Sequence, residues 1–375
     1  MDFARVGEEI ERATAAGVFP GAVILVSQAG RVLYHAAFGC RSLQPERAPM
    51  QPATIFDLSS LTKPLATTTA FMLLVRDGKV QLDDRVTRFL HNFGVHGKTH
   101  VTFRHLLAHC SGLPGWLPFY REIERIERQG RLNFVASRGA KEWVYEQIHR
   151  ERPAYETGAR SVYSDLGFML LGELIELISR QPLDRFCHER IFRPLGLRGT
   201  AFVDLSALRL KQLVPVTGMI APTERCPWRK RILCGEVHDD NAWAMGGVAG
   251  HAGLFASAAE VDALATRLLA CWRGENDFVP RAVVREFWTP VPNVPDSTWA
   301  LGWDTPSPAG SSAGTRMARR AVGHLGFTGT SLWIDLERAV SVVFLTNRVH
   351  PTRDDERIRE VRPRVHDAVM EALGA

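Results

Sequence analysis

Lysine is scarce in this chain, although the chain is basic overall. Only six of its 46 basic residues are lysines, so arginine supplies most of the charge behind the net value of +5. The arginines are scattered, and no long basic arm or nucleic-acid-binding motif accompanies them. This distribution is typical of a solvated surface, and we expect no nucleic-acid partner.

Long apolar runs, an export leader and paired cysteines are also missing. No segment approaches the roughly 20 apolar residues of a membrane-spanning helix, so we expect no membrane span. The first apolar run, residues 19–26, contains a Pro-Gly pair and follows no basic region, unlike a signal peptide. The six cysteines form no CxxC pair and predict reduced thiols. These features together predict a cytoplasmic protein.

Hydrophobic periodicity separates a helical middle from two ends that contain strands. Strand patterns occur near both termini, and the second pair is separated by a hairpin signal. The predicted helices are 2–16, 60–77, 102–108, 140–150, 166–180, 182–191, 258–273 and 354–373; the predicted strands are 22–27, 32–38, 331–336 and 339–346. A glycine-rich loop spans 244–257, and the pattern of 206–237 is mixed. The arrangement predicts an α+β fold with a helical insert.

Ser60 and Lys63 carry the first chemical signal. They are three residues apart at the start of a predicted helix, where positions i and i+3 share a face, so the amine can approach the hydroxyl. A serine becomes nucleophilic beside a base, and a helix N-terminus offers N–H groups to a developing oxyanion. Alone the spacing is a weak signal, because a capping serine followed by a surface lysine produces it too.

Two further motifs follow in order along the chain. Tyr163-Ser164-Asp165 opens an apolar helix, and His324-Leu325-Gly326 leads into a strand. With Ser60 and Lys63, this set resembles the three motifs Ser-x-x-Lys, Tyr-x-Asn and Lys-Thr-Gly of the serine β-lactamase and penicillin-binding-protein superfamily. The likeness is strongest to the class C β-lactamase and esterase-like branch.

Other segments resemble the same branch over residues 20 to 350. Residues 102–114 are similar to its LLxHxSGL stretch, 194–197 to its PLG turn and 250–257 to its GxAGGLxST loop. The resemblance implies a β-lactamase-like fold, with an antiparallel sheet flanked by N- and C-terminal helices and an inserted all-helical region. We expect a sheet domain of 1–57 and 240–375, a mainly helical domain of 58–239, and the active site in the cleft between them.

The resemblance also implies roles for individual residues. Ser60 would form an acyl-enzyme, while Lys63 and Tyr163 would share the general-base and general-acid work. The backbone N–H groups of Ser60 and of Phe327, the residue after Gly326, would form the oxyanion hole. We expect a small-molecule substrate, with no cofactor and no metal; the oligomeric state stays open.

Asp165 departs from the family pattern, which has Asn at this position. A carboxylate near Lys63 favours the ammonium form and raises the pKa of the lysine. A charged Lys63 is a poor base and would favour phenolate at Tyr163. We therefore assign Tyr163 as the base and Lys63 as electrostatic support, with a helix N-cap as the alternative role of Asp165.

The third motif departs further, because His324 and Leu325 replace Lys and Thr. Leu325 lacks a hydroxyl donor, and a histidine with an unperturbed pKa of about 6.5 is mostly neutral near pH 7. Both changes favour a neutral ester or amide over a penicillin. Arg316, Arg319 or Arg320 could supply the missing cation and bind a carboxylate.

Two competing patterns are weaker. The Gly-x-Ser-x-Gly match around Ser312 lacks the strand and helix that a nucleophile elbow needs. His105 and His109 are spaced i, i+4, but no His-Glu-x-x-His sequence or cysteine pair completes a zinc site. Residues 237–241 could line the site or form a plain loop.

The leading hypothesis is a serine hydrolase acting on an ester or amide, resembling a carboxylesterase. A β-lactamase or D-alanyl-D-alanine carboxypeptidase is the first alternative. An acyltransferase on the same scaffold is the second, and a non-catalytic binding protein is the third.

Overall fold

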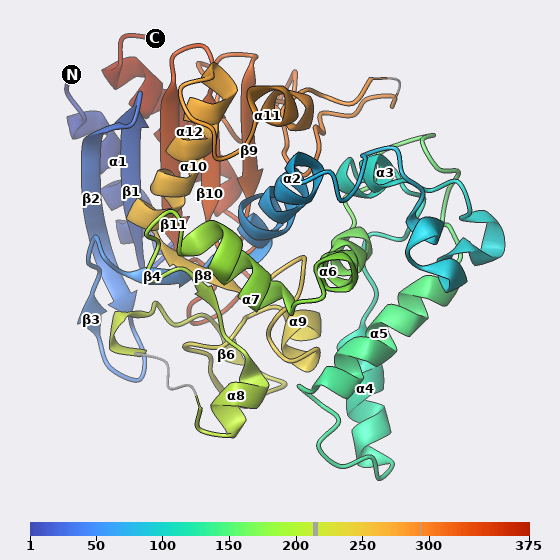
Figure 1. Cartoon of the computed structure of the whole chain (residues 1–375). Coiled ribbons are helices and arrows are strands. Elements are labelled where there is room, and N and C mark those ends of the chain that lie inside the picture. Colours follow the sequence, from blue (N-terminus) through green and yellow to red (C-terminus); the bar gives the residue numbers. More distant parts are fainter. Residues whose placement is uncertain (213–216, 293) are drawn as a thin grey trace.

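The computed structural model describes residues 1–212, 217–292 and 294–375 and has an α+β architecture (Figure 1). The α-helices are α1 (Ala4–Ala15), α2 (Thr69–Arg76), α3 (Phe103–Leu107), α4 (Phe119–Arg128), α5 (Arg138–Arg150), α6 (Asp165–Ser179), α7 (Leu183–Cys187), α8 (Leu205–Arg209), α9 (Asp240–Ala244), α10 (Ala258–Arg273), α11 (Arg281–Phe287) and α12 (Ile358–Ala372). The strands are β1 (Gly21–Gln28), β2 (Arg31–Ser42), β3 (Ala48–Pro49), β4 (Ile55–Asp57), β5 (Ala201–Phe202), β6 (Arg225–Cys226), β7 (Arg231–Ile232), β8 (Leu254–Ser257), β9 (Ala321–Leu325), β10 (Ser331–Asp335) and β11 (Val340–Thr346).

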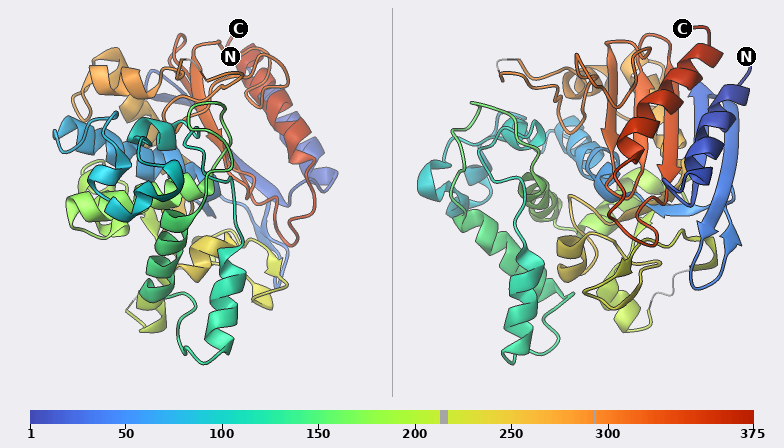
Figure 2. Two further views of the ribbon diagram at one scale, coloured as in Figure 1. Left: turned by 90° about the vertical axis from the view of Figure 1, so that its right-hand side faces the viewer. Right: turned by 180° about the vertical axis from the view of Figure 1, so that it is seen from behind.

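The main sheet joins the two ends of the chain. Its order is β3-β2-β1-β11-β10-β9, and every neighbouring pair is antiparallel. The N-terminal strand β1 pairs with the C-terminal strand β11 from Ala22↔Thr346 to Gln28↔Val340. The two termini consequently lie close together beyond one end of the sheet (Figures 1 and 2).

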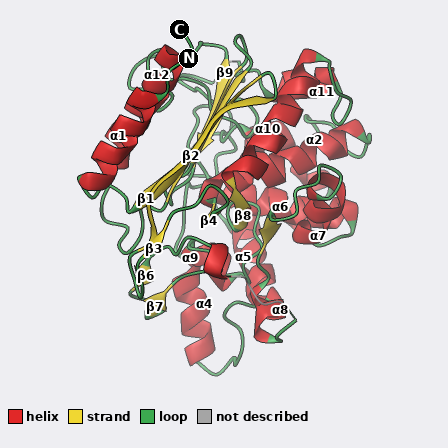
Figure 3. Cartoon of the chain, turned by 90° about the vertical axis from the view of Figure 1, so that its left-hand side faces the viewer, coloured by secondary structure: helices red, strands yellow, loops and turns green. Residues whose placement is uncertain are grey.

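Helices cover both faces of this sheet (Figure 3). The helices α1 and α12 pack side by side on one face, with Val6 and Ile10 in the same buried cluster as Val365 and Val369. The helix α10 packs against β1 and β11 from the other side. Burial on both faces explains why β1 is a continuous apolar run instead of an alternating one.

A second, three-stranded sheet, β4-β8-β5, leads into the first motif. The chain leaves β4 at Asp57, passes through a 3₁₀ turn over Ser59–Leu61, and continues as a π-helix over Lys63–Thr68 before α2 begins. The predicted single helix over 60–77 is therefore three segments. Pro64 has no N–H to donate within the first turn, and π-helical turns are frequent at functional sites.

Other boundaries differ from the sequence prediction. The predicted helix 182–191 divides into α7 and a π-turn over His188–Phe192, and the last helix begins at Ile358 instead of 354. The helix α4 was not predicted, and the mixed region contains α8 and the β6–β7 hairpin, with 213–216 outside the described residues. Among the described helices, none is both long and apolar enough to cross a membrane.

Candidate active site

Ser60 and Lys63 meet at the junction between the second sheet and the helical region. Lys63 Nζ lies 3.0 Å from Ser60 Oγ, and the lysine is fully buried whereas the serine is half-buried. The ammonium also donates to the carbonyl of His251 at 3.0 Å and lies 2.7 Å from Asp165 Oδ1. The amine thus lies between the candidate nucleophile and a carboxylate.

The environment of Lys63 favours its charged form. Burial alone lowers the pKa of the amine, but the Asp165 carboxylate and the Tyr163 oxygen outweigh this effect, so the pKa lies above its ordinary value. Lys63 is therefore an ammonium at neutral pH, in agreement with the expectation drawn from Asp165.

Tyr163 is held over this ion pair by the start of α6. The N–H of Ser164 donates to Nδ1 of His109 at 3.0 Å, and the His109 ring packs 4.7 Å from the tyrosine ring. The centroid of the Tyr163 ring lies 4.7 Å from Lys63 Nζ. His109 escaped the sequence analysis as a site residue, because its contact with Tyr163 joins segments more than 50 residues apart.

Lys63 favours the phenolate of Tyr163, as expected, but other influences keep the pKa of the phenol above its ordinary value. Burial raises the pKa of the phenol, and the Asp165 charge adds to the effect; Lys63 and hydrogen bonding to Ser60 act in the opposite direction without cancelling it. At neutral pH both Tyr163 and Lys63 are protonated, because removal of the pair from water penalises the phenolate more than the ammonium stabilises it.

Asp165 is not the helix cap. Ser164 occupies the N-cap position of α6, and its hydroxyl accepts the N–H of Gly167 at 3.1 Å. Asp165 is the first residue inside the helix and directs its carboxylate to Lys63. The alternative role for Asp165 was therefore wrong, and the cap lies one residue earlier.

The three motifs meet at a cavity of about 390 Å³. Tyr163 and Phe327 remain 37% and 46% exposed, so Ser60, the candidate nucleophile, lies beside aromatic surface that is open to the solvent. The lining residues are Ser60, Tyr163, Trp299, Asp304, His324, Leu325, Gly326, Phe327, Arg348, Glu356, Ile358, Arg359 and Arg362.

The third motif forms one wall of this cavity. Burial and the nearby Lys63 charge lower the pKa of His324 to about 3, so the imidazole is neutral, as expected. Its Nδ1 lies 2.7 Å from the carbonyl oxygen of Leu325, which can only accept, so Nδ1 carries the proton. Gly326 is sterically required, since a Cβ there would lie 2.0 Å from Thr330 Oγ1.

The expected oxyanion-hole donor at Phe327 is already engaged. Its N–H donates to the hydroxyl of Ser59 at 3.2 Å. Ser59 directly precedes the candidate nucleophile and has a φ of +50°, a conformation that non-glycine residues rarely adopt. The motif comparison assigned no role to this serine.

Three arginines that the sequence analysis did not select line the cavity: Arg348, Arg359 and Arg362. Arg362 is buried and donates to the carbonyls of Gly326 and Thr330, and its Nε has no partner among the described residues. The expected Arg316, Arg319 and Arg320 do not line the cavity, and Arg316 instead pairs with Glu371 at 2.9 Å.

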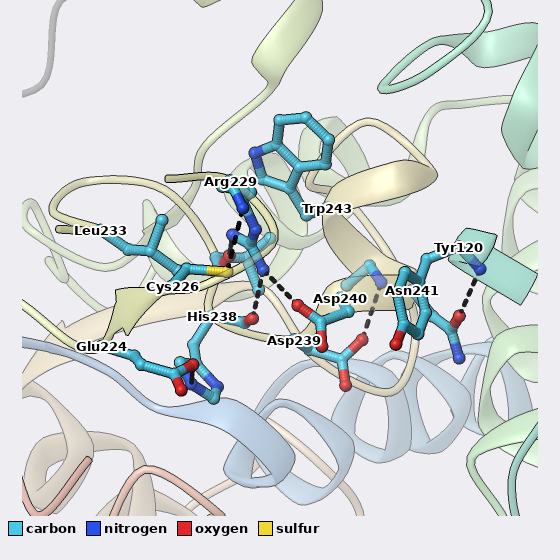
Figure 4. A network of polar contacts seen from close by, with 12 residues as sticks. Tyr120, Glu224, Cys226, Arg229, Leu233, His238, Asp239, Asp240, Asn241 and Trp243 are labelled. Atoms are coloured by element: carbon cyan, nitrogen blue, oxygen red, sulfur yellow. Dashed lines mark hydrogen bonds and ion pairs between the residues drawn. The ribbon is translucent and has the colours of Figure 1, made fainter. Parts of the chain in front are cut away.

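Residues 237–241 neither line the cavity nor form a plain loop (Figure 4). The N–H of His238 donates to Asp57 Oδ2 at 2.6 Å, and Asp239 lies 2.9 Å from Nε2 of His251, whose carbonyl accepts from Lys63. The buried Arg229 guanidinium binds the His238 carbonyl and Asp240. This segment therefore contacts Asp57, just before the turn that contains Ser60, and His251, which accepts a hydrogen bond from Lys63.

The competing patterns do not assemble a site. Ser312 lies in a stretch without helix or strand, and His105 closes a capping box with Thr102 at the start of α3. In residues 1–212, 217–292 and 294–375, no group of three or more metal-ligating side chains converges.

Comparison of the sequence with known proteins shows the family of the chain. The sequence profile of the Beta-lactamase family matches residues 7–366. The N-acetylmuramyl-L-alanine amidase of Bacillus subtilis (strain 168) is 33% identical over 376 residues, covering 94% of this chain and 82% of that protein. A putative D-alanyl-D-alanine carboxypeptidase of Escherichia coli (strain K12) is 30% identical over 361 residues, covering 90% and 81%.

Solved structures show the same fold. EstCE1, described as a hydrolase with promiscuous acyltransferase activity, superposes with a TM-score of 0.72 at 23% identity and covers 98% of this chain and 97% of its own. The fold and the matched relatives define a serine hydrolase. The chain belongs to the Beta-lactamase family, and the resemblance drawn from three short motifs is confirmed.

Proposed function

We propose that this protein hydrolyses a carboxylic ester or amide through an acyl-enzyme on Ser60, in the manner of a carboxylesterase. The observation that carries the proposal is the position of Lys63 Nζ, 3.0 Å from Ser60 Oγ and 2.7 Å from Asp165, beside an open cavity. The site would occupy the cleft between a sheet domain of 1–57 and 240–375 and a helical domain of 58–239.

In the proposed reaction, Ser60 Oγ forms a bond to the acyl carbon while its proton leaves. The carbonyl electron pair moves to oxygen, and the tetrahedral oxyanion then collapses, breaking the bond to the leaving group, which takes up the proton. Water repeats the sequence on the acyl-enzyme and restores Ser60. An alcohol in place of water would give the acyltransferase reaction on the same residues.

Tyr163 would accept the proton of Ser60, with the Lys63 ammonium stabilising the phenolate. Because both groups have raised pKa values, the reactive form, in which the pair has lost one proton, is a minority at neutral pH. Catalysis would therefore accelerate as the pH rises, in proportion to that form.

Labelling by a fluorophosphonate probe tests the nucleophile. The wild-type protein should gain one adduct by intact mass, and Ser60→Ala should lose both the adduct and at least about a thousandfold in turnover of p-nitrophenyl butyrate. Ser312→Ala is the matched control and should label normally. Labelling that persists in Ser60→Ala but disappears in Ser312→Ala would move the nucleophile to the other serine.

A second candidate, an amidase or carboxypeptidase acting on an anionic substrate, is favoured by Arg362. Burial and the neighbouring Arg348 and Arg359 lower the pKa of this guanidinium, yet an arginine remains charged at neutral pH. A buried cation near two other arginines, whose Nε has no partner among the described residues, favours binding of a carboxylate, although Glu356 on the same cavity pairs with Arg359. The names of the relatives, an amidase and a putative carboxypeptidase, support the same candidate.

The two candidates differ in the charge of the preferred substrate. The carboxylesterase proposal predicts that p-nitrophenyl butyrate has a higher kcat/KM than its anionic analogue mono-p-nitrophenyl glutarate and than nitrocefin. The second candidate predicts the reverse, with the preference for the anion falling about 10- to 100-fold in Arg362→Gln, as expected for one charged hydrogen bond. Arg316→Gln removes a cation outside the cavity and should leave the preference unchanged.

A further inference from the structure

We propose that Ser59 is a catalytic residue whose hydroxyl donates a hydrogen bond to the acyl oxyanion. The inference rests on the proposed function, because an oxyanion forms only if Ser60 attacks an acyl group. It assigns the role of direct donor to a side chain, where the motif comparison assigned only the backbone N–H groups of Ser60 and Phe327.

The backbone fixes Ser59 in an uncommon conformation. Its φ of +50° lies in the left-handed region, which is strained for a residue with a Cβ. The N–H of Ser59 donates to Asp57 Oδ1 at 2.8 Å, and its carbonyl accepts from Thr62 Oγ1 at 2.6 Å. Both ends of the residue are therefore held, and the direction of its side chain is given by the contact of its hydroxyl with Phe327.

That direction brings the hydroxyl next to the oxyanion hole. Ser59 Oγ accepts the N–H of Phe327 at 3.2 Å, and its chain neighbour Ser60 lines the cavity together with Phe327. Ser59 is 6% exposed, so its hydroxyl is shielded from bulk water, directly behind the cavity-lining residues Ser60 and Phe327 that it adjoins. Ser59 Oγ is therefore the side-chain hydroxyl in contact with the N–H that the oxyanion would approach.

The proton of this hydroxyl is available. A serine hydroxyl has one proton to donate and two lone pairs. One lone pair receives the Phe327 N–H, whereas no acceptor for the proton occurs in the part of the chain that the structure describes. The proton can therefore be donated to an incoming oxygen without breaking an existing bond.

Such a donor acts mainly in the transition state. The Phe327 N–H polarises the Ser59 hydroxyl, and a polarised hydroxyl donates more strongly to a full negative charge than to a neutral carbonyl. An interaction that strengthens as charge develops raises kcat and leaves KM nearly unchanged. The hydroxyl could instead act only as an acceptor that competes with the oxyanion for the Phe327 N–H. In that case it would slow the enzyme, and its removal would raise kcat.

Two substitutions separate the hydroxyl from the backbone strain. Ser59→Ala and Ser59→Gly both remove the hydroxyl, but glycine adopts a positive φ without strain and should preserve folding. Loss of an oxyanion-hole donor typically reduces kcat about 10²–10³-fold. We expect at least about a tenfold fall in kcat for both variants, because the released Phe327 N–H can partly replace the lost donor.

Phenylboronic acid provides an independent readout. Its tetrahedral adduct on Ser60 carries an oxygen in the oxyanion position, so its inhibition constant should rise by the same factor as kcat falls. Ser42→Ala is the matched control, since Ser42 has the same 6% exposure and donates only to Gln44 O, away from the cavity. This control should keep its kcat and its boronate affinity.

Two results with the Ser59 variants would overturn the proposal that its hydroxyl is an oxyanion donor. An unchanged or increased kcat in both Ser59 variants would show that the hydroxyl is not a donor. Full activity in Ser59→Gly beside a defective Ser59→Ala would assign the effect to the backbone. Failure of the proposed function is distinguishable, because fluorophosphonate would then not label Ser60 in the wild-type protein, whereas both Ser59 variants should still label, at a reduced rate.

Discussion

At the residue scale, Asp165 is the main influence that keeps Lys63 of the proposed catalytic pair, Lys63 and Tyr163, protonated. Its carboxylate lies 2.7 Å from Lys63 Nζ and is the largest influence that raises the pKa of that amine against the lowering effect of burial. In the family pattern an Asn fills this position, so the same lysine would there lack a fixed counter-charge. The difference makes the pH dependence of activity the sharpest probe of this residue.

Asp165→Asn should move the activity profile to lower pH. In the wild-type protein kcat/KM should rise through the alkaline range. The Lys63–Tyr163 pair must lose a proton to become reactive, and the negative charge of Asp165 makes that proton harder to remove. With the carboxylate gone, the largest influence that raises the pKa of Lys63 is lost and only that of Tyr163 still opposes burial, so the rising limb shifts to lower pH. The check is a pH–rate profile with p-nitrophenyl butyrate from pH 6 to 10.

A suitable control for that profile is Asp83→Asn. Asp83 forms an ion pair with Arg104 on the surface, and its loss should leave the profile in place. An Asp165→Asn profile that coincides with the wild type would mean that Lys63 does not determine the rate through its charge.

The residues that sequence could identify are those with local spacing. Ser60 and Lys63 are neighbours on one turn, and Tyr163 opens a helix, so a short window contains their signal. Arg362 and Ser59 act through contacts with segments more than 30 and more than 260 residues away in sequence, respectively. The spacing of residues in a single sequence does not reveal such contacts, because they form only when distant segments pack together in the folded chain.

At the element scale, the glycine-rich loop 244–257 packs against α6, and two of its carbonyl groups accept hydrogen bonds from the π-helix Lys63–Thr68. Gly250 O accepts from Thr67 Oγ1 at 2.6 Å, and the next carbonyl, of His251, accepts from Lys63. The sequence predicted the loop but not its partner. Close approach of two backbones requires glycine on both sides, and Gly172 of α6 supplies the second one.

Gly250→Ala should disturb stability and catalysis together. A Cβ at Gly250 would lie 2.1 Å from the carbonyl oxygen of Phe168 and 2.9 Å from Gly172 N, both backbone atoms that cannot move aside. Relief of the clash moves the loop and the acceptor of Lys63. We expect a loss of about 1–3 kcal/mol in the free energy of unfolding, with a lower kcat.

Thermal unfolding and turnover of the same samples check this prediction. Gly218→Ala is the control, because a Cβ there meets no atom of the described residues within 4 Å. A stable and fully active Gly250→Ala would show that the loop position does not fix Lys63.

At the scale of the whole molecule, the order of elements was predictable and their assembly was not. Strand patterns at both ends and helices in the middle follow from periodicity, since buried strands and amphipathic helices have different repeats. The break of the helix over 60–77 into 3₁₀, π and α segments depends on Pro64 and on contacts with β8 and the glycine-rich loop. The helix α4, which the sequence did not predict, packs against α9, a contact between distant segments.

The pairing of β1 with β11 has a consequence for synthesis of the protein. Residues 22–28 leave the ribosome more than 300 residues before their partner strand, 340–346, has been made. Until then the apolar β1 strand has one open edge and one uncovered face, which is the condition that chaperones recognise. A messenger truncated before residue 321 would yield a chain with Ser60, Lys63 and Tyr163 but without the cavity wall that the third motif forms, so we expect the truncated product to be inactive.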